Sequence, residues 1–279
     1  MAQPDDDELE ALEVRLFLEA VHERYGYDLR EYSSASMIRR VHAALIRSGA
    51  PNLAALQHRV LREPGLFASV LDDLTVRVSE MFRDPEFFLA FRKQVVPVLH
   101  TYPVLKIWLS GCASGEEVYS TAIILMEEGL YERTQLYATD LSPQALEQAK
   151  QGLYSAQQLP AFNTNYLQSG GQFNFTRYCT AAYDGVAMHE ALRRNVLFFQ
   201  HNLVSDHVFG EMHVVFCRNV LIYFEPELRQ RVMGTFRQSL CPGGFLALGR
   251  SERVQPSPGF SAFVGDQRIF RLERQEGAK

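Results

Sequence analysis

The sequence predicts an α/β protein, in which an all-α N-terminal domain precedes a doubly wound, Rossmann-like domain that carries a small β-subdomain. Three observations predict this fold. Five stretches with the helical spacing of apolar residues fill most of the first 99 residues. Several buried strands follow, and helices separate them, which is the pattern of a parallel sheet. The first of these strands ends in a glycine-bounded loop, where open α/β sheets bind nucleotide-like cofactors.

The N-terminal helices are predicted from apolar residues that recur every three to four positions between glycine and proline breaks. We expect an acidic, flexible N-terminus over residues 1–14, a helical domain over 15–96, a linker over 97–103 and the α/β domain over 104–279. The individual helices are predicted at 9–21, 36–48, 52–61, 65–74 and 84–99.

The stretch 104–124 has the pattern of a buried strand, a tight loop and the start of a helix. Gly111 and Gly115 let the backbone turn sharply and approach a ligand. Glu116 and Glu117 stand at the start of the helix, where a phosphate-binding loop offers bare N–H groups and often a lysine. Two carboxylates would repel a pyrophosphate and attract a ligand that combines adenosine with positive charge, and S-adenosylmethionine is the common cofactor of that kind. Stabilisation of the helix dipole is the alternative role of the two glutamates.

Residues 134–140 form the second predicted strand, and Asp140 stands at its carboxyl end. In doubly wound sheets a carboxylate at this position accepts hydrogen bonds from ribose hydroxyls. Ser142 and Pro143 suit an N-cap and a first-turn proline, so a helix is predicted directly after the strand. Asp140 is therefore a candidate cofactor ligand, and an ordinary strand end is the alternative.

A small insert is predicted at about 155–195, where the chain is less regular. The alternating segment 172–179 and the apolar stretch 196–200 together predict a hairpin beside the main sheet.

The segment 212–224 is predicted to hold the third buried strand, whose carboxyl end carries Cys217, Arg218 and Asn219. Polar residues at the end of a buried strand commonly face a site. A helix through Leu240 and two strands, at 245–249 and 268–272, complete the predicted domain.

The helical region contains a basic segment, although the formal net charge of the protein is −5. Residues 30–62 hold six arginines and one acid, Glu31. On the predicted helix 36–48, Arg40 and Arg47 are seven residues apart and fall on one side, away from the apolar face. Such a stripe is either a solvated face or a dock for an acidic partner. The net negative charge argues against nucleic acid as the main partner.

Composition indicates a cytoplasmic protein without metal. No run of 18 apolar residues is present, and the acidic start is the opposite of a signal peptide. The four cysteines form no CxxC pair, and no histidines cluster, so neither a disulfide framework nor a zinc site is expected.

Six segments resemble consecutive motifs of the CheR family, the chemoreceptor glutamate methyltransferases. They are TVRVSEMFRDPEFF from Thr75, GCASGEEVYS from Gly111, YATDLSPQALEQAKQGLY from Tyr137, HNL from His201, FCRNVLIYF from Phe216 and LALGRSE from Leu246. The similarity runs from roughly Tyr25 to Leu272, in the family's order and spacing. Five residues depart from the family's usual asparagine, threonine, phenylalanine, proline and histidine, and these are Arg77, Ser79, Met81, Val118 and Arg250.

The resemblance implies a class I methyltransferase domain that uses S-adenosylmethionine, releases S-adenosylhomocysteine and methylates glutamates of chemoreceptors. The partner that it implies is the cytoplasmic helical hairpin of a chemoreceptor, and the docking residues would be Arg39, Arg40, Arg47 and Arg59. The cofactor-binding residues would be Arg77, Ser79, Arg83, Gly111, Glu116, Asp140, Asn202, Leu203, Arg218 and Asn219. The residues at the methyl-transfer step would be Arg83, Arg218 and Tyr223.

Two other functions are compatible with parts of the sequence. A nucleotide-dependent oxidoreductase would share the fold class, but the GxGxxG fingerprint is missing from the first loop. A non-catalytic receptor-binding module would retain the fold, and the departures at Arg77 and Val118 are its only signs. For the leading function we expect a monomer that does not insert into the membrane.

Overall fold

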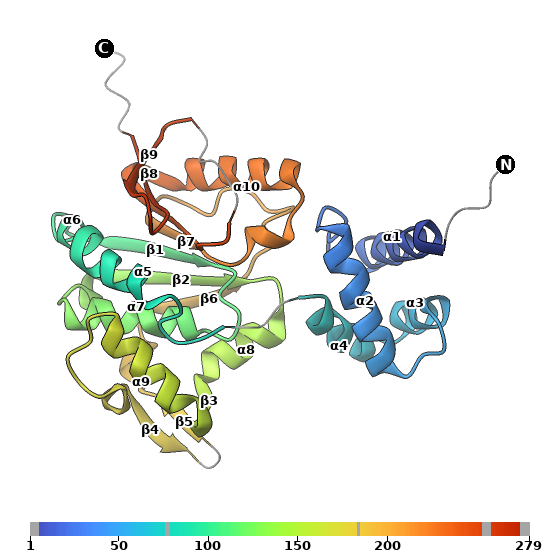
Figure 1. Ribbon diagram of the computed structural model, residues 1–279, viewed down its shortest axis with the longest axis horizontal. Helices are drawn as coiled ribbons and strands as arrows, with labels where there is room; N and C mark the ends of the chain where they lie inside the picture. The colour runs from blue at the N-terminus through green and yellow to red at the C-terminus, as the bar shows by residue number, and fades with distance from the viewer. Residues whose placement is uncertain (1–5, 76–78, 183–184, 253–257, 274–279) are drawn as a thin grey trace. The chain divides into compact units, whose positions relative to one another are not determined.

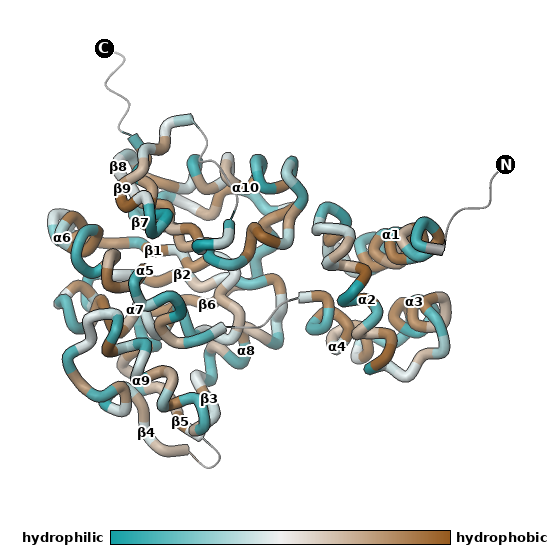
Figure 2. Tube along the Cα trace, viewed as in Figure 1, coloured by the Kyte–Doolittle hydropathy of each residue, from teal (hydrophilic) through white to brown (hydrophobic). Residues whose placement is uncertain are grey.

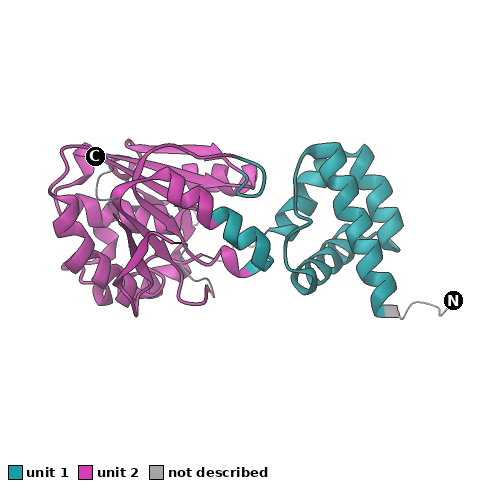
Figure 3. Cartoon of the chain, turned by 90° about the horizontal axis from the view of Figure 1, so that it is seen from above, with its two compact units in different colours: residues 1–76, 202–206, 223–232 teal, residues 77–201, 207–222, 233–279 magenta. Residues whose placement is uncertain are grey.

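The computed structural model describes residues 6–75, 79–182, 185–252 and 258–273. The chain divides into two compact units (Figure 3). We call the first the helical unit, which comprises residues 1–76, 202–206 and 223–232. We call the second the sheet unit, which comprises residues 77–201, 207–222 and 233–279.

The helical unit contains four N-terminal helices, which form where the apolar spacing predicts them. They are α1 (Asp6–Tyr25), α2 (Ser34–Ser48), α3 (Leu53–Arg62) and α4 (Pro64–Leu74) (Figure 1). Helix α2 ends at Gly49, whose φ of 66° is a left-handed conformation that glycine adopts without strain. The side chain of Asn52 caps α3 by accepting a hydrogen bond from the backbone of Ala55. Phe17, Val41 and Leu74 are fully buried in the core of this unit.

The expectation of a flexible segment over residues 1–14 is wrong from Asp6 onward, because α1 begins there. Acidic residues in the first turn favour a helix by complementing its dipole. The buried side chains of Val14 and Leu18 then fix the same helix to the core. The apolar spacing predicts a helix from residue 9 onward, so only residues 6–8 at the start of α1 lie outside the predicted helix.

The predicted boundary at residue 96 also differs from the structure, because the sheet unit starts at residue 77. The predicted helix 84–99 forms as α5 (Pro85–Ala90), a π-helical turn (Phe91–Val95) and α6 (Val96–Leu99). Its aromatic rings pack in the core of the sheet unit, where Phe87 and Phe91 lie 5.9 and 5.2 Å from the ring of Phe216. The predicted linker 97–103 therefore begins inside a helix of the sheet unit.

A seven-stranded sheet forms the centre of the sheet unit, in the order β6-β2-β1-β7-β8-β10-β9. The first five strands in this order are parallel, and β10 and β9 are antiparallel. The strands are β1 (Leu105–Ser110), β2 (Thr134–Asp140), β6 (Val196–Gln200), β7 (Met212–Cys217), β8 (Leu240–Leu248), β9 (Phe260–Val264) and β10 (Ile269–Leu272). The order reverses between β1 and β7, which is where doubly wound sheets bind their ligands. The predicted fold class is confirmed.

Helices cover both faces of this sheet, because side chains alternate along each strand. Trp108 of β1 points to one face and lies 5.5 Å, ring to ring, from Phe236 of α10 (Pro226–Ser239). Its neighbours Ile107 and Leu109 belong to the core on the other face, together with Ile123 of α7 (Glu116–Glu127). The hydropathy of the trace is drawn in Figure 2, where apolar residues run along β1.

The insert is a three-stranded antiparallel sheet rather than a simple hairpin. Its order is β3-β5-β4, with β3 (Leu153–Ser155), β4 (Cys179–Ala182) and β5 (Gly185–Met188). Helix α8 (Pro143–Gln151) precedes it, and α9 (Leu159–Gln168) lies between β3 and β4 in sequence.

The predicted hairpin partner was wrong, because residues 196–200 form β6 and pair with β2 of the main sheet. The predicted carboxyl end of the third strand is confirmed, because β7 ends at Cys217 and Asn219, with a φ of 60°, turns the chain out of the sheet. β9 was not predicted at all.

Candidate functional site

The loop between β1 and α7 has a conformation that requires its glycines. Gly111 and Gly115 have φ values of 72° and 93°. A Cβ atom on Gly111 would lie 2.4 Å from Cγ2 of Val220, and one on Gly115 would lie 2.9 Å from Cβ of Ala149. Both positions therefore combine positive φ with close packing, which only glycine accommodates. The sequence predicts the glycine loop correctly. It could not predict that Val220 and Ala149 pack against the two glycines.

Asp140 joins the end of β2 to this loop. Its Oδ2 accepts a hydrogen bond from the backbone of Ala113 at 2.8 Å, and its Oδ1 accepts one from the backbone of Ser142 at 2.9 Å. The backbone N–H groups of Gly111 and Cys112 add two further hydrogen bonds to the carbonyl of Thr139. The carboxylate is half-buried and stands at the carboxyl edge of the sheet, as the sequence predicts. Its contact with a ribose stays a prediction.

Glu116 is a buried carboxylate at the first position of α7, with 4% of its surface exposed. The hydroxyl of Ser114 lies 2.9 and 2.8 Å from its two oxygens. Burial raises the pKa of Glu116, and hydrogen bonds from Ser114 and Ser79 oppose this rise. The structure thus brings together two predicted cofactor residues, Ser79 and Glu116.

Arg218, at the end of β7, forms two ion pairs within the sheet unit. Its Nη1 lies 2.5 Å from Oε2 of Glu117, and its Nη2 lies 2.8 Å from Oδ2 of Asp84. Nη2 also donates to the backbone carbonyl of Arg83 at 3.0 Å, and the guanidinium carbon lies 4.0 Å from the ring centroid of Phe87. Only 1% of the Arg218 side chain is exposed.

These contacts change how the loop should be understood. Burial raises the pKa of Glu117, while the charges of Arg218 and, to a smaller degree, Arg83 lower it. Glu117 is thus the partner of Arg218, a role that sequence reasoning missed because the two are 101 positions apart. The pattern RDPEFF after residue 82 gave no sign that Asp84 shares the same guanidinium.

Tyr223 and Arg40 contact each other in the helical unit. The guanidinium carbon of Arg40 lies 4.4 Å from the centroid of the Tyr223 ring. Its Nη1 donates to the backbone carbonyl of Leu74 at 2.6 Å, and its buried Nη2 has no hydrogen-bond partner among the described residues. The backbone of Ser33 donates to the carbonyl of Tyr223 at 2.8 Å, which holds the tyrosine against α2.

The prediction that Arg40 belongs to an exposed basic stripe is therefore wrong. Only 7% of its surface is exposed, and this burial lowers its pKa. Helical spacing placed Arg40 beside Arg47, but it could not show that Leu74 and Tyr223 cover that part of α2. The other docking candidates are more open to solvent. Arg39 and Arg47 are exposed, and Arg47 pairs with Asp73.

Arg59, the fourth docking candidate, is half-buried. It donates to the backbone carbonyl of Ser48 at 3.1 Å and pairs with Glu63 at 3.3 Å. Its charge is thus shared with local partners, which lowers its availability to an acidic partner.

Asn202 and Leu203 lie in a turn that belongs to the helical unit. The backbone of Asn202 donates to Asp206 at 2.8 Å, and its side-chain oxygen accepts from the backbone of Val204 at 3.0 Å. Leu203 is half-buried. Their predicted contacts with the cofactor stay predictions, and Arg77 lies outside the described residues.

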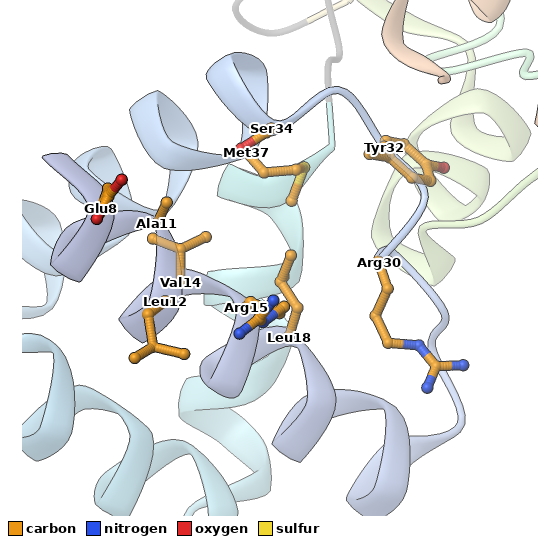
Figure 4. Close-up of a pocket in the computed structure, with 10 residues that line it drawn as sticks. All are labelled: Glu8, Ala11, Leu12, Val14, Arg15, Leu18, Arg30, Tyr32, Ser34 and Met37. Carbon is orange, nitrogen blue, oxygen red and sulfur yellow. The ribbon is translucent and has the colours of Figure 1, made fainter. Parts of the chain in front are cut away.

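A pocket of about 380 Å³ lies within the helical unit, and no sequence pattern predicted it (Figure 4). Apolar side chains such as Leu12 and Met37 line part of its wall, and the charged groups there come from Glu8, Arg15 and Arg30. It contains none of the predicted site residues. Within the described part of the chain, no three His, Cys, Asp or Glu side chains gather in a way that could hold a metal ion. None of the described helices is both long enough and apolar enough to cross a membrane.

Comparison with known proteins gives consistent results for the N-terminal and the C-terminal part of the chain. Residues 12–75 match the family described as CheR methyltransferase, all-alpha domain, and residues 77–269 match CheR methyltransferase, SAM binding domain. A Pseudomonas putida protein named putative methyltransferase Cher3 is 51% identical over 263 residues, which cover 93% of this chain and 96% of that protein. Chemotaxis protein methyltransferase 1 of Pseudomonas aeruginosa is 32% identical over 235 residues, covering 78% and 82%. The chemotaxis protein methyltransferase of Listeria monocytogenes is 27% identical over 245 residues, covering 85% and 88%.

Proposed function

Because this chain belongs to the CheR family of S-adenosylmethionine-dependent methyltransferases, we propose that it methylates glutamate side chains of chemoreceptors. The names of its relatives from Pseudomonas aeruginosa and Listeria monocytogenes include chemotaxis, which supports a receptor as the partner. In this proposal the partner is the cytoplasmic helical hairpin of a chemoreceptor, and the enzyme works in the cytoplasm as a monomer.

The residues at the carboxyl edge of the sheet fit the cofactor. S-adenosylmethionine supplies an electrophilic methyl group on a positively charged sulfonium. Glu116 and Asp140 give the glycine loop a negative charge, which favours a cationic ligand over a pyrophosphate. Asp140 would bind the ribose, and Arg83 with Ser79 would lie near the carboxylate of the cofactor. Arg77, Asn202, Leu203 and Asn219 remain proposed cofactor contacts on the strength of the resemblance.

The observation that carries the substrate class is the environment of Arg40. This guanidinium is buried, contacts the ring of Tyr223 and keeps one nitrogen without a hydrogen-bond partner among the described residues. A buried donor without a partner costs free energy unless a ligand satisfies it. A carboxylate is the group that best matches a guanidinium. We therefore propose that Arg40 and Tyr223 bind a glutamate carboxylate of the receptor.

The reaction depends mainly on the position of the glutamate carboxylate relative to the methyl group of the cofactor. A glutamate is ionised at neutral pH, so its attack on the methyl group needs no general base, only an in-line approach. Exclusion of water favours the step, because the two opposite charges neutralise each other on the way to the transition state. Arg218 would then be a positioning residue, since its side chain is engaged by Glu117 and Asp84.

The proposal is tested by incubating the protein with labelled S-adenosylmethionine and the cytoplasmic fragment of a candidate chemoreceptor. Mass spectrometry should find methyl esters on receptor glutamates. The variant Arg40→Met should bind S-adenosylhomocysteine normally but lose methyl transfer by at least tenfold, with Arg62→Met as the control, because Arg62 is exposed and is not a docking candidate. Normal cofactor binding without any receptor methylation, across the receptors of the same cell, would instead identify a non-catalytic receptor-binding module.

A further inference from the structure

Glu252 is a buried carboxylate that the proposed reaction does not use. It follows β8 and has 1% of its surface exposed. Its Oε1 accepts a hydrogen bond from the backbone of Val220 at 2.9 Å, and its buried Oε2 has no hydrogen-bond partner among the described residues. The strands that these residues follow are neighbours, with Cys217 of β7 opposite Leu248 of β8. A residue 32 positions downstream thus holds the turn after β7.

The turn that Glu252 holds contains a left-handed residue. Asn219 has a φ of 60°, a conformation that asparagine adopts more readily than other residues with a side chain. Such a conformation persists only where surrounding contacts fix it. The hydrogen bond from the backbone of Val220 to Glu252 supplies such a contact, because it fixes the residue that directly follows Asn219.

The backbone of Gly249 makes room for this arrangement. A Cβ atom at this position would lie 2.2 Å from Oε2 of Glu252 and 2.8 Å from the backbone nitrogen of Asn219. The backbone of Glu252 in turn donates to the carbonyl of Gly249 at 3.2 Å, which closes a short turn after β8. The turns after β7 and β8 are therefore in close contact with each other.

The turn after β7 also packs against the glycine loop that follows β1. Val220 packs so closely on Gly111 that a Cβ on the glycine would lie 2.4 Å from its Cγ2. Any shift of the turn after β7 would move Val220 against, or away from, the start of the glycine loop. Burial raises the pKa of Glu252, while the Val220 amide and then the charge of Arg218 lower it, and Glu117 opposes them.

We infer that Glu252 is a positioning residue for cofactor binding, which holds the Asn219–Val220 turn against the Gly111 loop. This inference rests on the proposed function, because it assumes that the loop binds S-adenosylmethionine. It assigns a role to the LALGRSE segment that charge and spacing alone could not supply. Glu252 makes no contact with the reacting groups in this inference, and it acts only through the backbone of the turn.

The test measures the dissociation constant for S-adenosylhomocysteine by calorimetry, together with the KM for S-adenosylmethionine. Glu252→Ala should raise the dissociation constant and the KM by at least tenfold in the folded protein. Glu252→Gln should stay within about threefold of wild type, because its side-chain oxygen can accept from Val220 while its amide group takes the place of the unpaired Oε2. Glu252→Asp, whose shorter side chain no longer reaches the turn, should fall between them and serves if the alanine variant does not fold.

Glu127→Ala is the matched control, because this carboxylate is also largely buried in the sheet unit but pairs with Arg92. It should lower the melting temperature without changing the affinity. If Glu252→Ala loses thermal stability but binds the ligand as wild type does, Glu252 is merely structural and the inference is overturned. If the wild-type protein itself does not bind S-adenosylhomocysteine, the proposed function has failed instead.

Discussion

Replacing Arg218 with methionine should destabilise the sheet unit strongly. Methionine keeps an apolar stem against the ring of Phe87 but removes the charge that Glu117 and Asp84 share. Removal of one partner from a buried ion pair costs about 3–5 kcal/mol. The Asp84 side chain is 32% exposed and Glu117 is 19% exposed, so solvent relieves part of this cost. We expect a loss of about 3 kcal/mol in the free energy of unfolding, which is roughly a 150-fold change in the folding equilibrium.

The loss should depend on pH, and its sign follows from Glu117. Burial raises the pKa of this carboxyl, and Arg218 lowers it, so the variant should have a still higher pKa at Glu117. A carboxyl whose pKa is higher in the folded than in the unfolded state binds more protons when folded. The stability of Arg218→Met should therefore fall as the pH rises from about 4.3, the ordinary pKa of glutamate, through the raised pKa. The defect is expected to be smaller at pH 5 than at pH 8.

Urea unfolding followed by tryptophan fluorescence measures the free energy of unfolding directly, because the only tryptophan, Trp108, is buried in the sheet unit. The double variant with Glu117→Gln should recover about 1–2 kcal/mol relative to Arg218→Met, since it removes an uncompensated buried charge. A double variant that is less stable by the sum of the two single effects would refute the reasoning. So would an Arg218→Met protein whose stability is the same as that of wild type at both pH values.

Three further predictions address the loop and the docking surface. Asp140→Ala should weaken the binding of S-adenosylmethionine by about 1–3 kcal/mol without unfolding the protein, and calorimetry that finds an unchanged affinity would contradict this. The double variant Arg39→Glu/Arg47→Glu should raise the KM for an acidic receptor helix at low ionic strength, with less effect in high salt and none on cofactor affinity. Equal methylation rates at low salt would place the dock elsewhere. Tyr154→Phe, which removes a hydrogen bond to the carbonyl of Ser114, should lower the unfolding free energy by about 1 kcal/mol and loosen cofactor binding, as thermal melts with and without S-adenosylhomocysteine would report.

Local sequence determined the secondary structure around the site and the conformation of the first loop. The helices α2, α3 and α4 formed within two residues of their predicted ends, because apolar spacing and caps act between residues a few positions apart. The Gly111 loop and the position of Asp140 at the end of β2 were likewise predictable, since the strand–turn–helix pattern determines both. The resemblance to the CheR family extended this to the cofactor and the reaction class, which the comparisons support.

Tertiary structure alone decided which side chains meet. The apolar pattern of residues 85–99 is the same for helices that pack on other helices and for helices that pack on a sheet. Only the structure shows that Phe87 and Phe91 pack against Phe216 of the sheet. Arg40 and Arg47 occupy one side of a helical wheel, but only the fold buries the first under Tyr223 and leaves the second exposed. The pairing of Arg218 with Glu117 spans 101 positions. Periodicity records which face of an element is apolar, whereas burial and ion pairing depend on which distant element covers that face, so they exist only in the folded chain.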